Sequence, residues 1–279
     1  MLPQYPRFSV IIICAARRKH LFWTLRACLK NNKLPTEIIV IHMDDMYEFY
    51  SPLALIKQFR IPKKDGELNL AGARNLGANK ATTNQLIFLD VDCIPNTYCF
   101  ERILNSLSSK NVVQGTPKYL TKSVTNLKCL NLKSIYHPLK PPVKTSIREK
   151  DYNQFWSLIF GIKRSTFLKL GGFHENYQGY GAEDTDLGQK FEMHTLNLYR
   201  ANAIVYHQYH QVYRPPLNHF LGIVRNAQVF YDRWGFMPMM NWIEKFKETK
   251  LVEINNGQLK VLRLPTSNEI EEAKSCNAF

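Results

Sequence analysis

Residues 86–93 constrain the fold of this chain most strongly, because an apolar run ends there in two carboxylates. The stretch reads Leu-Ile-Phe-Leu-Asp-Val-Asp-Cys, which places Asp90 and Asp92 directly after four apolar residues. A continuous apolar run of this kind is typical of a buried parallel strand, and alternation along a strand sends both aspartates to one side. Ligands of open α/β sheets bind beyond the carboxyl ends of the strands. The stretch therefore predicts a strand that ends at a site for a divalent cation and the phosphates it carries.

The same two acids also have a purely structural interpretation. Residues 94–96 read Ile-Pro-Asn, so Asp90 and Asp92 can begin a turn and cap a helix that starts near Thr97. A short D-x-D pattern does not distinguish the two interpretations, so motifs elsewhere in the sequence are needed to choose between them.

The first part of the chain has the pattern of a nucleotide-binding α/β half. Residues 8–13 form an apolar, β-branched run that predicts a central strand, and residues 21–30 have the spacing of a helix. A second strand is predicted over residues 37–41 and ends near Asp44 and Asp45. No G-x-G-x-x-G follows the first strand, which argues against a dinucleotide cofactor.

A stretch of small residues around Arg74 predicts a helix that lies close to the sheet or to a ligand. Residues 69–78 read Asn-Leu-Ala-Gly-Ala-Arg-Asn-Leu-Gly-Ala, and Arg74 near the start of such a helix can meet a diphosphate. A helix packed on the sheet with Arg74 on a carboxylate explains the same pattern equally well. Further elements are predicted as a strand within 55–61, a helix over 97–108 and a strand over 112–115.

Glycines and tyrosines precede three acids in residues 173–187. Glu183, Asp184 and Asp186 open a predicted helix, where acids complement the helix dipole. The glycines, however, let the backbone approach a ligand closely. Tyrosine faces beside carboxylates suit a sugar, which offers an apolar face and hydroxyl groups. The stretch therefore has both a structural and a sugar-binding interpretation.

A predicted strand over residues 202–206 ends in His207. A lone histidine is usually a core or surface residue, but His207 leaves a strand end as Asp92 does, so the two can meet on one ion. His210 lies nearby and competes for the same role. After this strand we expect an amphipathic helix over 217–234, a basic segment with an apolar face over 236–247, and a small strand followed by a polar tail.

The positive net charge of the chain favours an anionic partner. The net charge is +14, and residues 116–164 hold ten Lys or Arg against Glu149 and Asp151. Nucleic acid, a phospholipid surface and phosphorylated small molecules all fit this excess, as does a solvated basic face without a partner. Prolines in the same stretch predict a long irregular segment, which can close over a substrate phosphate or lie on anionic lipid.

Composition argues against several classes of protein. No apolar run approaches the roughly 20 residues needed to cross a bilayer, and the first residues lack a secretory signal. We therefore expect a cytoplasmic protein with peripheral contact with an anionic membrane. Six cysteines without a C-x-x-C pair indicate neither a zinc site nor a disulfide framework.

Taken in order, these motifs resemble those of the GT-A glycosyltransferases, in the family 2-like branch with a C-terminal part like that of galactosyl- and N-acetylgalactosaminyltransferases. The resemblance covers roughly residues 6–235 and rests on residues 8–13, 73–77, 86–92, 171–173 with 179–187, and 205–207. It implies a mixed α/β sheet flanked by helices. The GT-A domain would span 1–250, with a nucleotide-sugar half at about 1–116, an acceptor half at about 150–235 and a C-terminal extension at 251–279.

The resemblance also implies an activity, which is inverting transfer of a hexose or N-acetylhexosamine from a UDP-sugar to a glycan or lipid-linked acceptor, with Mn²⁺ or Mg²⁺. Residue by residue it makes Asp92 and His207 metal ligands with Asp90 beside them, and Asp184 the base with Glu183 holding the acceptor. The donor-site residues that it implies are Arg74, Ala15, Arg17, Asp44, Asp45 and Asp90, the last of which would lie by the ribose and the metal-bound diphosphate. The second strand departs from the family pattern, because His-Met-Asp-Asp stands where two acids followed by Gly-Ser are usual.

Two other functions fit parts of the sequence. A sugar nucleotidyltransferase shares the nucleotide-binding sheet and acidic metal ligands, but it needs a glycine-rich phosphate loop where this chain has Ala-Ala-Arg-Arg. A non-enzymatic nucleic-acid-binding protein fits the positive charge, and it predicts salt-sensitive binding to any duplex. We expect nucleic acid not to be the partner.

Overall fold

The centre of the protein is a mixed sheet built from the apolar runs of the sequence. The structure, a computed structural model, describes residues 6–43, 49, 51–275 and 277–278. Within these residues the sheet has ten strands, eight of them in the order β3-β2-β1-β4-β9-β6-β10-β5, while β7 pairs with β6 and β8 with β10. The strands are β1 (Ser9–Cys14), β2 (Glu37–His42), β3 (Ile56–Arg60), β4 (Gln85–Asp90), β5 (Cys93–Pro95), β6 (Asn111–Leu120), β7 (Ser134–Tyr136), β8 (Ile147–Glu149), β9 (Ile159–Lys163) and β10 (Asn197–His207).

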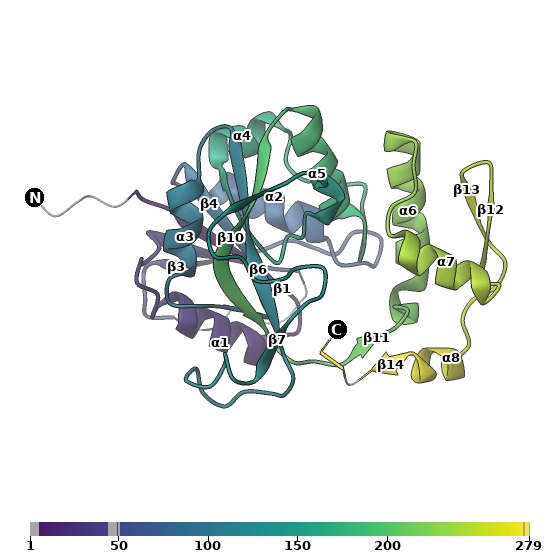
Figure 1. Cartoon of the computed structure of the whole chain (residues 1–279), viewed down its shortest axis with the longest axis horizontal. Coiled ribbons are helices and arrows are strands. Elements are labelled where there is room, and N and C mark those ends of the chain that lie inside the picture. The colour runs from purple at the N-terminus through teal and green to yellow at the C-terminus, as the bar shows by residue number, and fades with distance from the viewer. Residues whose placement is uncertain (1–5, 44–48, 50, 276, 279) are drawn as a thin grey trace, which may run out of the picture.

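Helices cover both faces of this sheet (Figure 1). Along β1, Val10 and Ile12 pack on one face and Ile11 and Ile13 on the other, as strand alternation requires. Helices α1 (Arg18–Cys28) and α3 (Cys99–Ser106) cover the first face, and α2 (Leu70–Lys80), α4 (Arg164–Lys169) and α5 (Glu183–Met193) cover the second. The predicted mixed α/β sheet flanked by helices is therefore confirmed.

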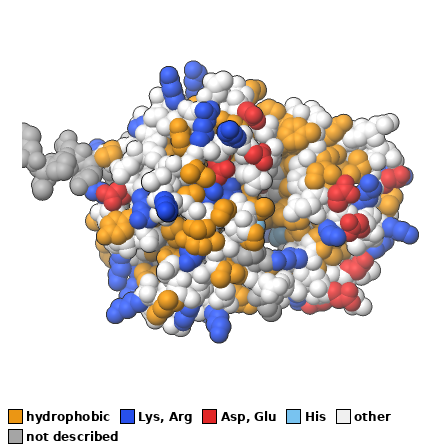
Figure 2. All heavy atoms as spheres, viewed as in Figure 1, with side chains coloured by type: hydrophobic (Ala, Val, Ile, Leu, Met, Phe, Trp, Pro, Cys, Tyr) orange, Lys and Arg blue, Asp and Glu red, His pale blue; other side chains and the backbone are white. Residues whose placement is uncertain are grey.

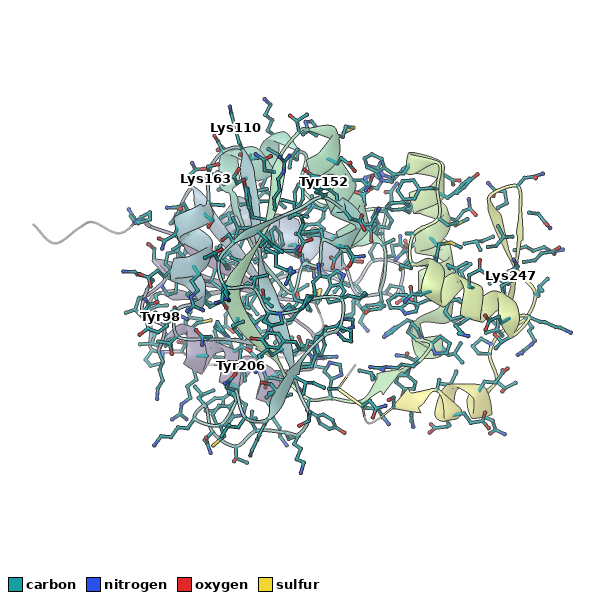
Figure 3. The ribbon with its side chains drawn as sticks, in the orientation of Figure 1. Tyr98, Lys110, Tyr152, Lys163, Tyr206 and Lys247 are labelled. Carbon is teal, nitrogen blue, oxygen red and sulfur yellow. The ribbon has the colours of Figure 1, made fainter. Side chains whose placement is uncertain are left out.

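The basic stretch is more regular than its prolines suggest, and the prediction of a long irregular segment was wrong in part. Strand β6 continues to Leu120, β7 pairs with it, and β8 pairs with the start of β10. Lys140 is only 1% exposed, and its ammonium donates to the carbonyl of Gln154. The Tyr152 hydroxyl, in the 3₁₀ turn η1 (Tyr152–Gln154), donates to the Leu196 carbonyl at 2.6 Å (Figure 3). Partners elsewhere in the fold thus order short segments on either side of Pro138, Pro141 and Pro142.

The C-terminal part forms a separate layer beside the sheet, at the right of Figure 1. Its elements share one apolar cluster that includes Ile223, Phe246 and Val252. They are β11 (Val212–Tyr213), η2 (Leu217–His219), α6 (Phe220–Trp234), α7 (Met240–Glu248), β12 (Val252–Asn255), β13 (Gln258–Val261), α8 (Ser267–Glu272) and β14 (Lys274–Ser275). The prediction of one small strand and a polar tail was wrong, because β12 and β13 pair as a hairpin and α8 has a Thr266 capping box.

Figure 2 shows a recess between the main body and the C-terminal part, with a histidine side chain visible inside it. Acidic side chains gather on the C-terminal part in this view, while Lys and Arg are spread over the main body. None of the described helices has the length and apolar character of a membrane-spanning segment.

The Glu37 carboxylate connects β1, β3 and the segment before β4 by hydrogen bonds. Its ionisation makes the free energy of unfolding depend on pH. The carboxylate accepts hydrogen bonds from Ser9, Thr82 and Lys57. Burial alone would raise the pKa of Glu37, but these donors outweigh it and lower the pKa to about 2. Because the folded pKa lies below the unfolded one, this stabilisation is present above about pH 4.5 and is lost as the pH falls toward 2.

We therefore expect Glu37→Gln to lower the free energy of unfolding by about 2 kcal/mol at pH 7. The difference from the wild type should shrink as the pH approaches 3, measured by denaturant titration at several pH values. Glu253→Gln on the exposed β12 strand is the matched control. A difference that stays constant across this pH range would contradict the assignment.

Candidate active site

Strand pairing brings Asp92 next to His207. Asp92 lies between β4 and β5, and β5 runs antiparallel to the end of β10, with Cys93 opposite His207. The backbone N–H of Gln208 donates to the Asp92 carbonyl at 2.7 Å, which extends this pairing by one step. Two positions far apart in the sequence therefore meet because both follow strands of the same sheet.

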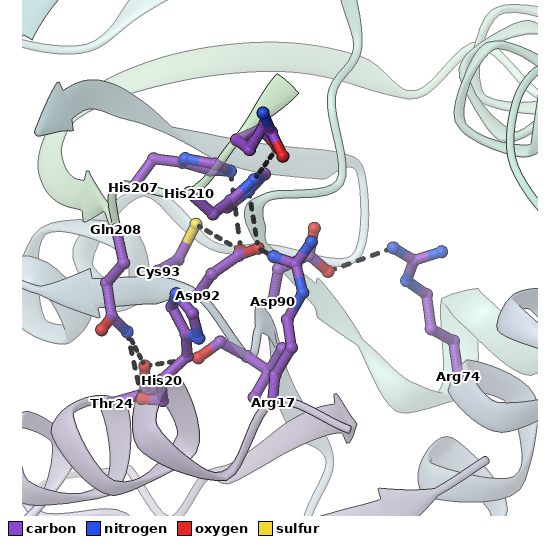
Figure 4. Close-up of polar contacts among 12 residues, drawn as sticks. Arg17, His20, Thr24, Arg74, Asp90, Asp92, Cys93, His207, Gln208 and His210 are labelled. Atoms are coloured by element: carbon purple, nitrogen blue, oxygen red, sulfur yellow. Dashed lines mark hydrogen bonds and ion pairs between the residues drawn. The ribbon is translucent and has the colours of Figure 1, made fainter. Parts of the chain in front are cut away.

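His210 joins this pair, so Asp92 faces two imidazole rings (Figure 4). The Nε2 atom of His207 lies 3.7 Å from Asp92 Oδ1, and Nε2 of His210 lies 3.5 Å from Oδ2. One ligand atom from each of the three residues lies within 4.8 Å of the others. The sequence left His207 and His210 as competitors, but the structure places both beside Asp92.

The charges at this cluster favour the protonation states that bind metal. Burial lowers the pKa of His207 to about 4, so its ring is neutral near pH 7. Burial opposes ionisation of Asp92, but His207, His210 and Arg17 outweigh it and hold the pKa of this carboxyl well below its usual range. Arg17, in the loop after β1, donates from its guanidinium to the Asp92 carboxylate.

The hydrogen bond on the far side of His210 fixes which nitrogen faces Asp92. Nδ1 lies 2.9 Å from the Gln211 carbonyl, and because a carbonyl only accepts, Nδ1 carries the proton. In the neutral ring this tautomer leaves the lone pair on Nε2, the atom that faces the Asp92 carboxylate, as in metal-binding histidines. One carboxylate and two imidazoles within reach of one another offer the oxygen and nitrogen ligands that a divalent cation can use once the ligand atoms are free of protons.

A second group of charges surrounds Arg74, which is 5% exposed. Its guanidinium contacts Asp90 at 3.1 Å (Figure 4) and Glu183 at 3.4 Å, so in this structure Arg74 lies on carboxylates. Burial raises the pKa of Asp90 to about 6, with Arg74 opposing and the charges of Asp92 and Asp184 adding to the rise. Burial and the charge of Asp184 raise the pKa of Glu183 to about 7.

Asp184 enters the site from the first turn of α5. The preceding residue, Ala182, has φ 69°, and this left-handed turn starts the helix beside the glycine loop. The Ser157 backbone N–H donates to Asp184 Oδ2 at 3.0 Å. The other oxygen, Oδ1, is buried and has no hydrogen-bond partner among the described residues. A buried carboxylate oxygen without a donor is suited to accept a proton from a bound hydroxyl.

Asp186, the third acid of this helix, has a structural role. Its side chain is fully buried, and Oδ1 accepts from the Tyr177 hydroxyl at 3.1 Å. The same oxygen accepts from Arg233 Nε and Trp234 Nε1, each at 2.8 Å. Asp186 therefore connects the start of α5 to the end of α6.

The other predicted donor-site residues do not all lie at the Asp92 cluster. Asp44 and Asp45 lie outside the described residues. Ala15 is half-buried, follows β1 and packs against the apolar core, whereas Arg17 reaches the Asp92 cluster.

Sequence reasoning missed Tyr119, which stacks on the His207 ring at 4.8 Å between centroids. Strands β6 and β10 place these two residues opposite each other. Tyr119 was not recognised as a site residue because the strand before it was expected to end at residue 115, which left Tyr119 in the basic stretch that follows.

Two family profiles match the chain. The profile described as glycosyl transferase family 2 matches residues 9–167, and one described as the N-terminal domain of galactosyltransferase matches residues 143–214. Together these matches include β4, β9, α5 and the end of β10.

Curated relatives are matched over limited parts of their length. Beta-1,4-galactosyltransferase 4 of Cricetulus griseus is 35% identical over 54 residues, which cover 19% of this chain and 16% of the relative. Chondroitin sulfate synthase 3 of Mus musculus is 28% identical over 185 residues, 63% of this chain and 19% of the relative. The chain thus spans less than a fifth of the length of either protein.

A solved structure shares the fold. The structure of GalNAc-T7 with UDP, GalNAc and Mn²⁺ superimposes with a TM-score of 0.56 at 17% identity, covering 72% of this chain and 43% of that one. The family 2 match spans more than half of the chain, and the superposition agrees with it in fold. The chain therefore belongs to glycosyl transferase family 2 and has the GT-A fold.

Proposed function

We propose that this protein moves a hexose or N-acetylhexosamine from a UDP-sugar to a hydroxyl of a glycan or lipid-linked acceptor, with inversion and with Mn²⁺ or Mg²⁺. The observation that carries the proposal is the cluster of Asp92, His207 and His210 beside the acids Asp90 and Asp184. The negative charge of Asp184 contributes to the raised pKa of Asp90, so the two groups of acids are close enough to interact.

The metal would be held by Asp92, His207 and His210, with Asp90 beside them. A bound divalent ion supplies positive charge for the diphosphate that leaves from the anomeric carbon. Arg17 already contacts Asp92 and is placed to contact a diphosphate at the same site. Arg74 would act by holding Asp90 and Glu183 in position, since it forms an ion pair with each of these carboxylates.

The acceptor hydroxyl would lose its proton to Asp184. Its Oδ1 is the buried oxygen without a donor, and the Ser157 N–H holds the other oxygen. Glu183 would hold the acceptor, with Oε2 fixed by the Gly181 N–H at 3.2 Å. A base on one side of the sugar and a leaving group on the other favour a single displacement, which inverts the anomeric carbon.

The relatives support the choice of donor. GalNAc-T7 was solved with UDP, GalNAc and Mn²⁺, and the matched galactosyltransferase transfers a sugar of the same class. A UDP-hexose or UDP-N-acetylhexosamine is therefore the donor we propose for this chain.

A thermal-shift panel of UDP, GDP, CMP and dTDP sugars with and without Mn²⁺ tests this donor. A UDP-sugar should raise the melting temperature only when Mn²⁺ is present, and chelator should reverse the shift, because a ligand stabilises the state that it binds. Stabilisation by another nucleotide class alone, or an equal shift in chelator, would contradict the proposal.

We further propose that the basic loop between β6 and β8 places the enzyme on an anionic membrane, at its cytoplasmic face. This loop exposes Leu132 at 87% and Leu139 at 61% together with Lys128 and Lys133. Apolar side chains beside lysines suit an anionic lipid surface, where each Lys near the surface contributes about 1 kcal/mol.

Sedimentation with phosphatidylserine vesicles at low and physiological salt tests this contact. We expect binding that falls with salt and weakens at least several-fold in Lys128→Glu/Lys133→Glu. Lys245→Glu/Lys247→Glu on α7 is the matched control, since both lysines are exposed on the C-terminal part. Equal sedimentation with neutral vesicles would remove the proposal.

A further inference from the structure

The loop that carries Tyr180 is held by helices that lie beyond the two family matches, which end at residue 214. Asn226 of α6 is fully buried, and its amide donates to the carbonyls of Gln178 and Gly181, each at 3.0 Å. Its oxygen accepts from the Gln178 N–H at 3.1 Å. One side chain thus fixes the backbone on both sides of Tyr180.

Two rings from the C-terminal part lie against the Tyr180 ring. Trp242 of α7 lies 5.8 Å away between centroids with 29° between the planes, and His219 of η2 lies 5.1 Å away with 31°. Tyr180 remains 43% exposed, His219 is exposed and Trp242 is half-buried. We call Tyr180, His219 and Trp242 the aromatic rim.

The aromatic rim adjoins the acids of the site through the segment that carries Tyr180. Tyr180 is followed within four residues by Glu183 and Asp184. Burial of the Tyr180 hydroxyl raises its pKa, and the charges of Glu183 and Asp184 add to this rise. The N–H of Gly181, the residue after Tyr180, donates to Glu183 Oε2 at 3.2 Å, so the exposed Tyr180 ring adjoins the acids of the site.

We propose that the aromatic rim binds a sugar ring of a glycan acceptor. Tyr180 lies within the family-matched residues, and Trp242 and His219, which lie beyond them, complete this acceptor subsite. This inference rests on the proposed function. A pyranose presents a face of C–H groups that packs on an aromatic ring, and its hydroxyls at the edge suit the neighbouring carboxylates. An acceptor without a sugar ring gains nothing from these side chains.

Packing alone is the competing explanation for Trp242, because this side chain also lies against the apolar cluster of the C-terminal part. A packing role predicts a lower melting temperature without a change in glycan affinity. His219 separates the two explanations, since its exposed side chain contributes little to that cluster.

The experiment uses the full chain with UDP and Mn²⁺ on a glycan array, followed by the Kd of the glycan that gives the strongest signal. Trp242→Ala should raise this Kd about tenfold, as the loss of one aromatic contact predicts, and His219→Ala should raise it several-fold. Trp242→Phe should recover most of the affinity. The ratio of transfer to UDP-sugar hydrolysis should fall with the affinity in each variant.

Phe236→Ala is the matched control, because this ring is 39% exposed on the same part of the chain and packs on Phe230 instead of Tyr180. It should leave the glycan Kd unchanged. Wild-type Kd values in both Trp242→Ala and His219→Ala would overturn the inference, as would a wild type that hydrolyses UDP-sugar but binds no glycan. A wild type that neither binds UDP nor hydrolyses UDP-sugar would instead overturn the proposed function.

Discussion

Asp92→Ala should reduce metal-dependent sugar transfer by roughly 10³-fold or more, because it removes the carboxylate that faces both His207 and His210. The remaining imidazoles carry no negative charge and cannot by themselves balance a divalent cation. Turnover with UDP-sugar across a Mn²⁺ titration measures the effect, and excess Mn²⁺ should not restore the wild-type rate.

The matched control for this change is Asp232→Ala, which removes an exposed carboxylate of α6 outside the site. It should transfer sugar at the wild-type rate. Melting temperatures measured without metal test whether Asp92→Ala still folds, and we expect a folded protein. A folded Asp92→Ala protein with wild-type turnover would contradict the assignment of the metal site.

Asp184→Asn should lower kcat by about 10²-fold or more, the usual range for a general base. Asparagine keeps an oxygen that accepts the Ser157 N–H, so the loop should stay in place while the proton acceptor is lost. The Kd for UDP with Mn²⁺ should change little, which separates loss of the base from loss of donor binding.

Glu192→Gln is the control on the same helix, because this carboxylate is exposed near the end of α5. It should behave as the wild type. If Asp184→Asn kept a wild-type kcat, or if its main effect were on UDP affinity, Asp184 would not be the base.

The sequence predicts the central strands well because their signal is local. Residues 8–13, 37–41 and 86–90 are apolar runs, and each forms a strand at about the expected place. Asp92 and His207 both follow such strands, and the rule that ligands collect at strand ends was enough to suggest that they meet.

Other contacts of the site depend on loop conformation and could not be read from the sequence. Arg17 reaches Asp92 only because of the path of the loop after β1, and His210 depends on the turn that follows β10. Arg74 contacts Asp90 and Glu183, which is the carboxylate-bound alternative that the sequence left open. No local pattern distinguishes a diphosphate from a carboxylate as the partner of an arginine.

The segments that were predicted least well take their order from distant partners. Strands β7 and β8 are three residues each and are stabilised by pairing with β6 and β10. The β12–β13 hairpin packs on α6 and α7, so its strands are set by tertiary contacts as much as by their own residues. Such short strands have too little periodicity to be recognised alone.

Isothermal titration of Mn²⁺ into the UDP-saturated protein tests most directly whether the ends of β4 and β10 form one metal site. We expect about one Mn²⁺ per chain, and loss of this binding in Asp92→Ala and in His207→Ala/His210→Ala. Mn²⁺ binding that persists unchanged in both variants would show that the cation, if the enzyme uses one, is held elsewhere.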